Sequence, residues 1–114
     1  MHPQLKITVL GLVSVLALAL APAAYANSTA VQLTFDNNHF SPESVTVPAR
    51  QPLVLKVMNQ SSETIEFESF KLNRERSMQP GETIIVHLPA LSPGTYDFYD
   101  DFHQSVPQGT IVAR

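Results

Sequence analysis

The residues best suited to chemistry lie near the C-terminal end of the sequence. Tyr96 and Phe98 alternate with polar neighbours, which is typical of a strand with one buried face, and the same alternation turns Asp100 toward that face. A carboxylate in apolar surroundings needs a cation, a metal ion or hydrogen-bond donors beside it, because burying it alone is costly. Asp101 and His103 follow within three residues, and loops of hairpin size can turn such neighbours toward one point.

A second pair of carboxylates lies on a predicted strand in the middle of the chain. Glu66 and Glu68 share one face of this strand, and Ile65 and Phe67 share the other. Two adjacent carboxylates repel each other unless a cation lies between them. The plain alternative is a solvated outer face that carries two harmless acids, and the alternation alone favours this alternative.

The side chains present restrict the kind of metal. The 114 residues include no cysteine, which excludes disulfide bonds and zinc or iron-sulfur sites with thiolate ligands. Imidazole binds copper, iron and zinc, whereas carboxylates suit iron, manganese and calcium. Clustered Asp, Glu and His therefore suit hard or borderline metal ions with oxygen and nitrogen ligands.

The elements that must position these residues are short strands. Pro and Gly divide the chain, and most segments between them alternate apolar and polar residues at period two. The apolar positions of seven predicted strands are Val31, Leu33 and Phe35; Val45 and Val47; Leu53, Leu55 and Val57; Ile65 and Phe67; Ile84, Val86 and Leu88; Tyr96 and Phe98; and residues 110–113. Residues 71–78 are too polar for a strand, and we expect a turn or loop there. The pattern predicts an all-β sandwich of two packed sheets.

The first 26 residues form a separate segment, which we interpret as a cleaved secretory signal peptide. Lys6 is its only ionised side chain, residues 7–20 are mostly apolar, and residues 24–26 (Ala-Tyr-Ala) have the small-x-small pattern of a cleavage site. A membrane anchor is less suitable because a spanning helix needs about 20 apolar residues. We therefore expect an exported mature domain at residues 27–114 that is not embedded in the membrane.

The mature domain is small and acidic. Its 88 residues carry six Lys and Arg against ten Asp and Glu, a formal charge of −4. This balance lacks the basic footprint of a nucleic-acid-binding protein.

The predicted last hairpin resembles that of the cupredoxins. Residues 94–103 (GTYDFYDDFH) and the closing Gly109 resemble the cupredoxin pattern in which a Gly-x-Tyr-x-Phe-x-Cys strand leads to a His, a weak axial ligand and a Gly. Residues 40–42 (Phe-Ser-Pro) and 45–47 (Val-Thr-Val) resemble the second cupredoxin strand. The resemblance covers about residues 31–113 and implies a Greek-key β-sandwich.

The sequence departs from blue-copper cupredoxins at the metal ligands. Asp100 stands where the cysteine belongs, Glu66 stands near the first His position, and Gln108 falls near the axial Met position. Only His103 keeps its expected type. Without a thiolate, the trigonal site of blue-copper electron carriers cannot form.

These departures resemble a narrower group. Residues 66–68 (Glu-Phe-Glu), 74–76 (Arg-Glu-Arg) and 100–103 (Asp-Asp-Phe-His) are similar to the cysteine-free cupredoxin-like proteins of Ftr-type bacterial ferrous-iron uptake systems and to the cupredoxin-like domain of EfeO-type iron-binding proteins. The resemblance implies a periplasmic protein that binds a copper ion, an iron ion or both. It also implies an iron permease and other components of the uptake system as partners.

The resemblance implies a particular set of ligands. The predicted centre consists of Glu66, Asp100 and His103, with Glu68, Asp101 and Glu75 around it and His39 as a further candidate. His39 is equally consistent with a surface loop, and Glu75 with a solvated charge cluster. We expect Met78 to be a loop or packing residue and His87 to be an exposed strand residue.

The sequence is consistent with two functions. The protein either supports oxidation of ferrous iron before ferric uptake, or it binds copper or iron as a chaperone or buffer without redox turnover. We also expect replacement of Asp100 by Ala to be neutral or stabilising in the metal-free protein, because it removes a carboxylate that has lost its cation.

Overall fold

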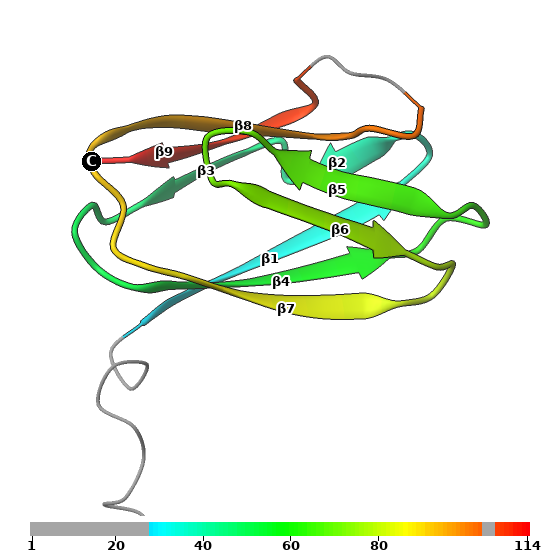
Figure 1. Ribbon diagram of the computed structural model, residues 1–114, viewed down its shortest axis with the longest axis horizontal. Coiled ribbons are helices and arrows are strands. Elements are labelled where there is room, and N and C mark those ends of the chain that lie inside the picture. Colours follow the sequence, from blue (N-terminus) through cyan, green and yellow to red (C-terminus); the bar gives the residue numbers. More distant parts are fainter. Residues whose placement is uncertain (1–27, 104–106) are drawn as a thin grey trace, which may run out of the picture.

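The computed structural model describes residues 28–103 and 107–114, and the signal peptide predicted at residues 1–26 lies outside these residues. The described residues form nine strands in two packed sheets (Figure 1), which confirms the predicted all-β sandwich. One sheet has the order β2 (His39–Ser41), β1 (Thr29–Asp36), β4 (Leu53–Asn59) and β7 (Thr83–Leu88). The other has the order β3 (Ser44–Val47), β9 (Gly109–Ala113), β8 (Gly94–Asp100), β5 (Ile65–Ser69) and β6 (Arg74–Met78).

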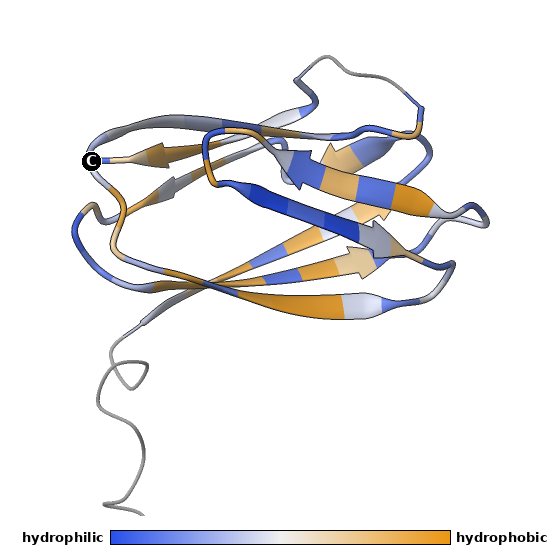
Figure 2. Cartoon of the chain, viewed as in Figure 1, coloured by the Kyte–Doolittle hydropathy of each residue, from blue (hydrophilic) through white to orange (hydrophobic). Residues whose placement is uncertain are grey.

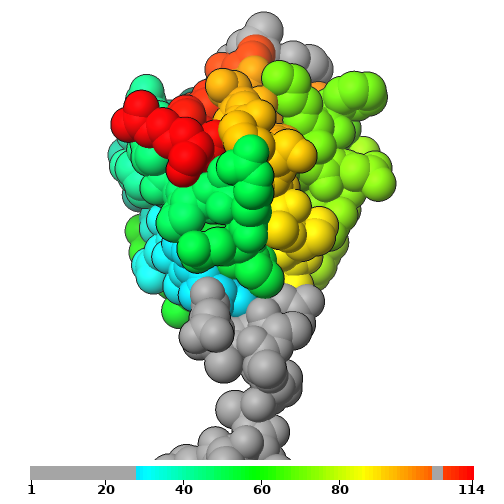
Figure 3. Space-filling model, turned by 90° about the vertical axis from the view of Figure 1, so that its left-hand side faces the viewer, coloured from blue at the N-terminus to red at the C-terminus, as the bar shows by residue number. Residues whose placement is uncertain are grey.

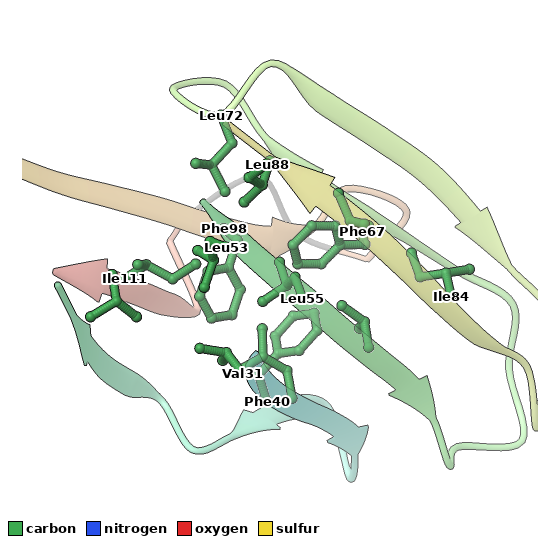
Figure 4. Packing of buried hydrophobic residues seen from close by; sticks show 14 of the residues in the cluster. Val31, Phe40, Leu53, Leu55, Phe67, Leu72, Ile84, Leu88, Phe98 and Ile111 are labelled. Carbon is green, nitrogen blue, oxygen red and sulfur yellow. The ribbon is translucent and has the colours of Figure 1, made fainter. Parts of the chain in front are cut away.

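The core forms where the apolar faces of the two sheets meet. In β5, buried Ile65 and Phe67 alternate with half-buried Glu66 and Glu68, and Figure 2 shows this alternation as bands along the strand. Figure 4 shows the resulting packing, with side chains from both sheets between the layers. At its centre four aromatic rings pack mainly edge to face, at centroid distances of 4.8–6.0 Å: Phe35, Phe40, Phe67 and Phe98.

The prediction of a turn or loop at residues 71–78 is wrong for its second half, which forms β6. This strand lies at the edge of its sheet and pairs only with β5 among the described residues. Figure 2 shows that β6 is hydrophilic along most of its length, because an edge strand can keep most of its side chains in water. Met78, the last residue of β6, is buried, as expected for a packing residue. The alternation of apolar and polar residues did not predict β2, because three residues are too few to show a period of two.

One end of the sandwich carries the segments that matter for function. The β4–β5 turn and residues 101–103, which follow β8, lie toward the right-hand end in Figure 1. The β1–β2 hairpin turn lies at the same end (Figure 1). Its two central residues, Asn37 and Asn38, both adopt positive φ angles (50° and 65°), as in a type I′ turn. Close to this end, Gly109 pairs with Phe98, and the ring of Phe98 covers it so closely that a Cβ atom would lie 2.3 Å from Cζ.

Three segments of the chain cover the opposite end of the sandwich (Figure 3). The C-terminal residues, the β3–β4 turn and the segment after β7 lie side by side there. Ala49 donates a hydrogen bond to the carbonyl of Arg114, and Arg50 donates one to Leu91. His87, on β7, is exposed as predicted. Within residues 28–103 and 107–114, the chain has no helix with the length and apolar character needed to cross a membrane.

Candidate metal centre

Asp100 ends β8 on the inner face of its sheet. Its side chain has no exposed surface, which confirms the inward orientation predicted from Phe98. Oδ1 accepts hydrogen bonds from the backbone N–H groups of Glu66 at 2.9 Å and Phe102 at 3.1 Å. Oδ2 contacts Nδ1 of His103. The buried carboxylate therefore has the donors and the cationic partner that burial requires.

His103 lies between two carboxylates. Its Nδ1 atom faces Asp100, and its Nε2 atom lies 2.6 Å from Oε2 of Glu63. The hydrogen bond to Asp100 is the main cause that raises the pKa of His103, and the charges of Asp100 and Glu63 add to it while desolvation opposes it. In the metal-free protein, the hydrogen bond to Asp100 thus favours the protonated, cationic form of His103.

Gln108, the residue immediately before β9, completes this group. Its Oε1 atom accepts a hydrogen bond from the backbone N–H of Asp100, and its Nε2 atom donates to the carbonyl of Asn38 at 3.1 Å. We name Asp100, His103, Glu63 and Gln108 the inner site. It opens into a hollow of about 310 Å³ lined by Phe35, Asn38, Glu63, His103 and Gln108.

A second group of acids lies on the outer face of the same sheet. The strand register places Glu68 directly opposite Glu75 of β6 on one side and Tyr99 of β8 on the other. Glu66 lies beside Asp101, whose backbone N–H donates to the carbonyl of Glu66 at 2.9 Å. Glu66, Glu68 and Asp101 each present a carboxylate oxygen within 4.8 Å of the other two. We name Glu66, Glu68, Glu75 and Asp101 the outer acidic site.

The carboxylates of the outer acidic site repel one another. A hydrogen bond with Glu75, together with burial and the neighbouring charges, raises the pKa of Glu68 to about 7. Burial and the same neighbours raise the pKa of Glu66, and burial and Glu68 raise that of the Tyr99 phenol. One oxygen of Glu68, Oε1, is buried without a hydrogen-bond partner. Like charges in opposed positions destabilise a sheet, so a cation at this site would relieve the repulsion.

The structure distributes the predicted ligands over two sites instead of one. Asp100 and His103 meet at the inner site, whereas the side chain of Glu66 joins Glu68, Glu75 and Asp101 on the outer face. Glu66 nevertheless connects the two, because its backbone N–H donates to Asp100.

His39 lies in a different position from these two groups. It is exposed on β2, its Nδ1 atom lies 3.0 Å from the carbonyl of Asn37, and it lines a hollow between the β1–β2 hairpin and Gln60. This placement agrees with the surface alternative for His39.

Sequence reasoning missed Glu63. The residue lies in a polar turn, Asn59 to Thr64, where nothing distinguishes its carboxylate from an ordinary solvated one. A signal was available in Asn59, which ends an apolar strand and begins a segment of turn-forming residues. That signal predicts the turn but not the contact with His103, which is 40 residues away in the chain.

The donor atoms determine what the two sites could hold. The inner site offers the imidazole of His103, the carboxylate of Asp100 and the amide oxygen of Gln108, with Glu63 on the other ring nitrogen of His103, and the chain has no thiolate. Such a set fits a borderline ion with nitrogen and oxygen ligands and not a blue-copper centre. The outer acidic site offers only carboxylates, which suit hard ions.

The family model of the cupredoxin-like domain matches residues 8–113, so the chain belongs to the cupredoxin-like domain family. An uncharacterized protein of Rickettsia prowazekii (strain Madrid E) is 37% identical over 88 residues, which cover 77% of this chain and 70% of that protein.

Solved structures share the fold. Auracyanin A, a "blue" copper protein of Chloroflexus aurantiacus, superposes with a TM-score of 0.64 at 15% identity over 77% of this chain and all (100%) of that one. The metal-binding domain of the Cu(I)-exporting P-type ATPase CopA of Streptococcus pneumoniae D39, solved with Cu(I), gives a TM-score of 0.66 at 8% identity over 75% and 84% of the two chains. At these identities the similarity shows the fold alone.

Proposed function

We propose that this is a periplasmic metal-binding protein that holds copper at the inner site and ferrous iron, its substrate, at the outer acidic site. In this role it supports the oxidation and uptake of iron together with a membrane iron permease. The observation that carries the proposal is the position of Glu66, whose backbone holds the buried carboxylate of the inner site while its side chain belongs to the outer one.

The inner site fits copper by the chemistry of its donors. Asp100 Oδ2 and His103 Nδ1 face each other, and a cation between them would replace the proton that they share in the metal-free protein. Copper bound there would supply a one-electron acceptor. The blue copper protein and the Cu(I)-loaded domain that share this fold support the choice of copper.

The outer acidic site fits iron and favours its higher oxidation state. Carboxylates are hard anionic donors, and they stabilise Fe(III) more than Fe(II). The site already contains three carboxylate oxygens within 4.8 Å of one another, and burial and the neighbouring carboxylates raise the pKa values of Glu66 and Glu68, so a bound cation would relieve their repulsion. Iron that binds there gains the charge compensation that the protein does not provide.

The two sites are neighbours in the sheet, and this arrangement would let an electron pass from one to the other. They lie on opposite faces of the β5–β8 pair, where Phe67 is opposite Asp100, and two hydrogen bonds join them: Glu66 N–H to Asp100 Oδ1 and Asp101 N–H to Glu66 O. The iron that gives the electron and the copper that accepts it would therefore lie on the two faces of one strand pair, with only the thickness of the sheet between them.

Single-turnover mixing tests the proposal. One equivalent of Fe(II) added without oxygen to Cu(II)-loaded protein should remove the Cu(II) signal in electron paramagnetic resonance and form one equivalent of Fe(III), because each iron releases one electron and each copper accepts one. Glu68→Gln should slow this step, since it removes a carboxylate from the outer acidic site. Glu43→Gln is the matched control, because it removes a carboxylate from an exposed turn.

The alternative is a copper chaperone or buffer, and the same experiment separates the two. Copper that binds at the inner site but is not reduced by Fe(II) would favour the chaperone. In cells, deletion of the gene should slow growth on ferrous iron and leave uptake of chelated ferric iron intact. Normal growth on ferrous iron combined with copper sensitivity would contradict the proposal.

A further inference from the structure

Glu63 is the part of the inner site that the proposed function leaves without a role. Its carboxylate is 61% exposed, yet Oε2 lies 2.6 Å from Nε2 of His103. Exposed ion pairs usually contribute little to stability, so the energy of this pair does not explain it. The position of Glu63 explains the contact, because its carboxylate binds the ring nitrogen of His103 that points away from Asp100.

The turn that carries Glu63 is held from inside the protein by Asn59. This side chain has no exposed surface, and its Nδ2 atom donates to the carbonyls of Glu63 at 2.8 Å, Gln79 at 3.1 Å and Met78 at 3.3 Å. Its Oδ1 atom accepts from the backbone N–H and the hydroxyl of Ser61 at 3.0 and 2.6 Å. Buried polar networks of this kind fix geometry, so the backbone of Glu63 has a defined place relative to the β6–β7 turn.

We propose that Glu63 is the positioning residue of the inner site: its carboxylate holds Nε2–H of His103, so that Nδ1 is the nitrogen presented to Asp100 and to a bound metal ion. The inference rests on the proposed function, because it concerns the same site. Imidazole ligands of metals usually donate their second N–H to a carboxylate or carbonyl, which fixes the tautomer and the ring orientation and makes the ligand more basic. Glu63 provides that partner, and Asn59 keeps it in place.

The first test uses the metal-free protein and NMR of the His103 ring. At a pH where the imidazolium carries both protons, wild-type protein should show two slowly exchanging ring N–H signals, one held by Asp100 and one by Glu63. Glu63→Ala should lose the protected Nε2–H signal and keep that of Nδ1–H. Glu63→Gln should restore it, because the amide oxygen still accepts a hydrogen bond. Glu43→Gln, the matched control, should leave both signals unchanged.

The second test measures metal binding on the same variants. Zn(II), a diamagnetic probe, should shift the Nδ1 resonance of wild-type His103 and leave Nε2 protonated. Titration with Cu(II) should show about a 10- to 100-fold weaker affinity for Glu63→Ala, the usual effect of losing such a partner, and a smaller change for Glu63→Gln.

The outcomes separate this inference from the proposed function. Zn(II) on Nε2, or equal Cu(II) affinity and equal Nε2–H protection in wild type and Glu63→Ala, would overturn the positioning role while metal binding itself stood. Loss of Nε2–H protection in metal-free Glu63→Ala, combined with no effect of any metal on wild-type His103, would confirm the contact with Glu63 but remove the metal site, and the inference would fail together with the proposed function.

Discussion

Replacing Asp100 by Ala removes a carboxylate that three donors share. Glu66 N–H and Phe102 N–H lose their acceptor, and His103 loses the carboxylate that its Nδ1 atom contacts. The sequence alone suggested that this change would be neutral or stabilising in the metal-free protein. The contacts reverse that expectation, because the carboxylate already has its cation and its donors without a metal.

The magnitude follows from the two backbone donors. Each donor left without a partner costs about 1–3 kcal/mol, so the pair costs about 2–6 kcal/mol. Phe102 is exposed as a residue and its hydrogen bond to Asp100 is only partly buried, so we expect the lower half of this range, about 2–4 kcal/mol. Folded domains are stable by only about 5–15 kcal/mol, so the loss is a large fraction of the total. Asp100→Asn keeps an acceptor oxygen and should lie between wild type and Asp100→Ala.

Urea unfolding of the metal-free proteins measures this difference. With an m value of about 2 kcal/mol/M, the unfolding midpoint of Asp100→Ala should fall by about 1–2 M. The variants should also differ in their dependence on pH. The folded-state pKa of His103 is raised, so its contribution is complete below the unfolded value near 6.5 and is lost as the pH rises through the folded value. Asp100→Asn should reduce this loss, because the hydrogen bond that raises the pKa is changed.

Two results would refute the reasoning. If Asp100→Ala unfolds within about 0.5 kcal/mol of wild type, the size of an ordinary surface substitution, then the backbone donors do not depend on Asp100. If Asp100→Asn and wild type lose stability equally as the pH rises above 6.5, then the pair with His103 does not contribute to folding.

Four further predictions follow from other features. Gly109→Ala should destabilise the protein by about 1–3 kcal/mol in urea unfolding, because its Cβ atom would overlap the ring of Phe98; an unchanged midpoint would contradict the close packing. Wild-type protein should lose stability as the pH rises from 4.5 through about 7, the direction set by the raised pKa of Glu68, and Glu68→Gln should lose less; parallel curves would show that the outer acids do not repel. The Cu(II) protein should show only weak ligand-field absorption, and an intense thiolate band would contradict the ligand set. His103→Ala should weaken Cu(II) binding at least tenfold in calorimetric titration, whereas His87→Ala should not; equal affinities would remove the inner site.

The sequence predicted the sandwich well because period-two alternation reports burial directly. It identified the inward carboxylate of Asp100 by the same rule, since Phe98 and Asp100 share parity. The rule fails for β6, whose edge position lets polar residues occupy a strand, and it is silent about Glu63, which lies in a turn without periodicity.

The arrangement of the ligands depended on information that a single sequence does not contain. Parity indicates that Glu66 and Glu68 share a face, but the partners of that face depend on register. The pairings of Glu68 with Glu75 and with Tyr99 join segments that alternation cannot align. One sequence-based site therefore became two, which lie on opposite faces of the sheet, and strand pairing determines which residues join each of them.

The pairing of β3 has a consequence for when the protein can fold. Among the described residues, β3 lies at the edge of its sheet and its neighbour is β9, whose partner residues lie 66 positions later in the chain. Such distant pairings are slow to form, because the entropy cost of closing a long loop comes before the contacts that compensate for it. A chain still emerging from the ribosome could not complete the sheet until Ala113 was free. The half-built sandwich would meanwhile stay open and accessible to a chaperone.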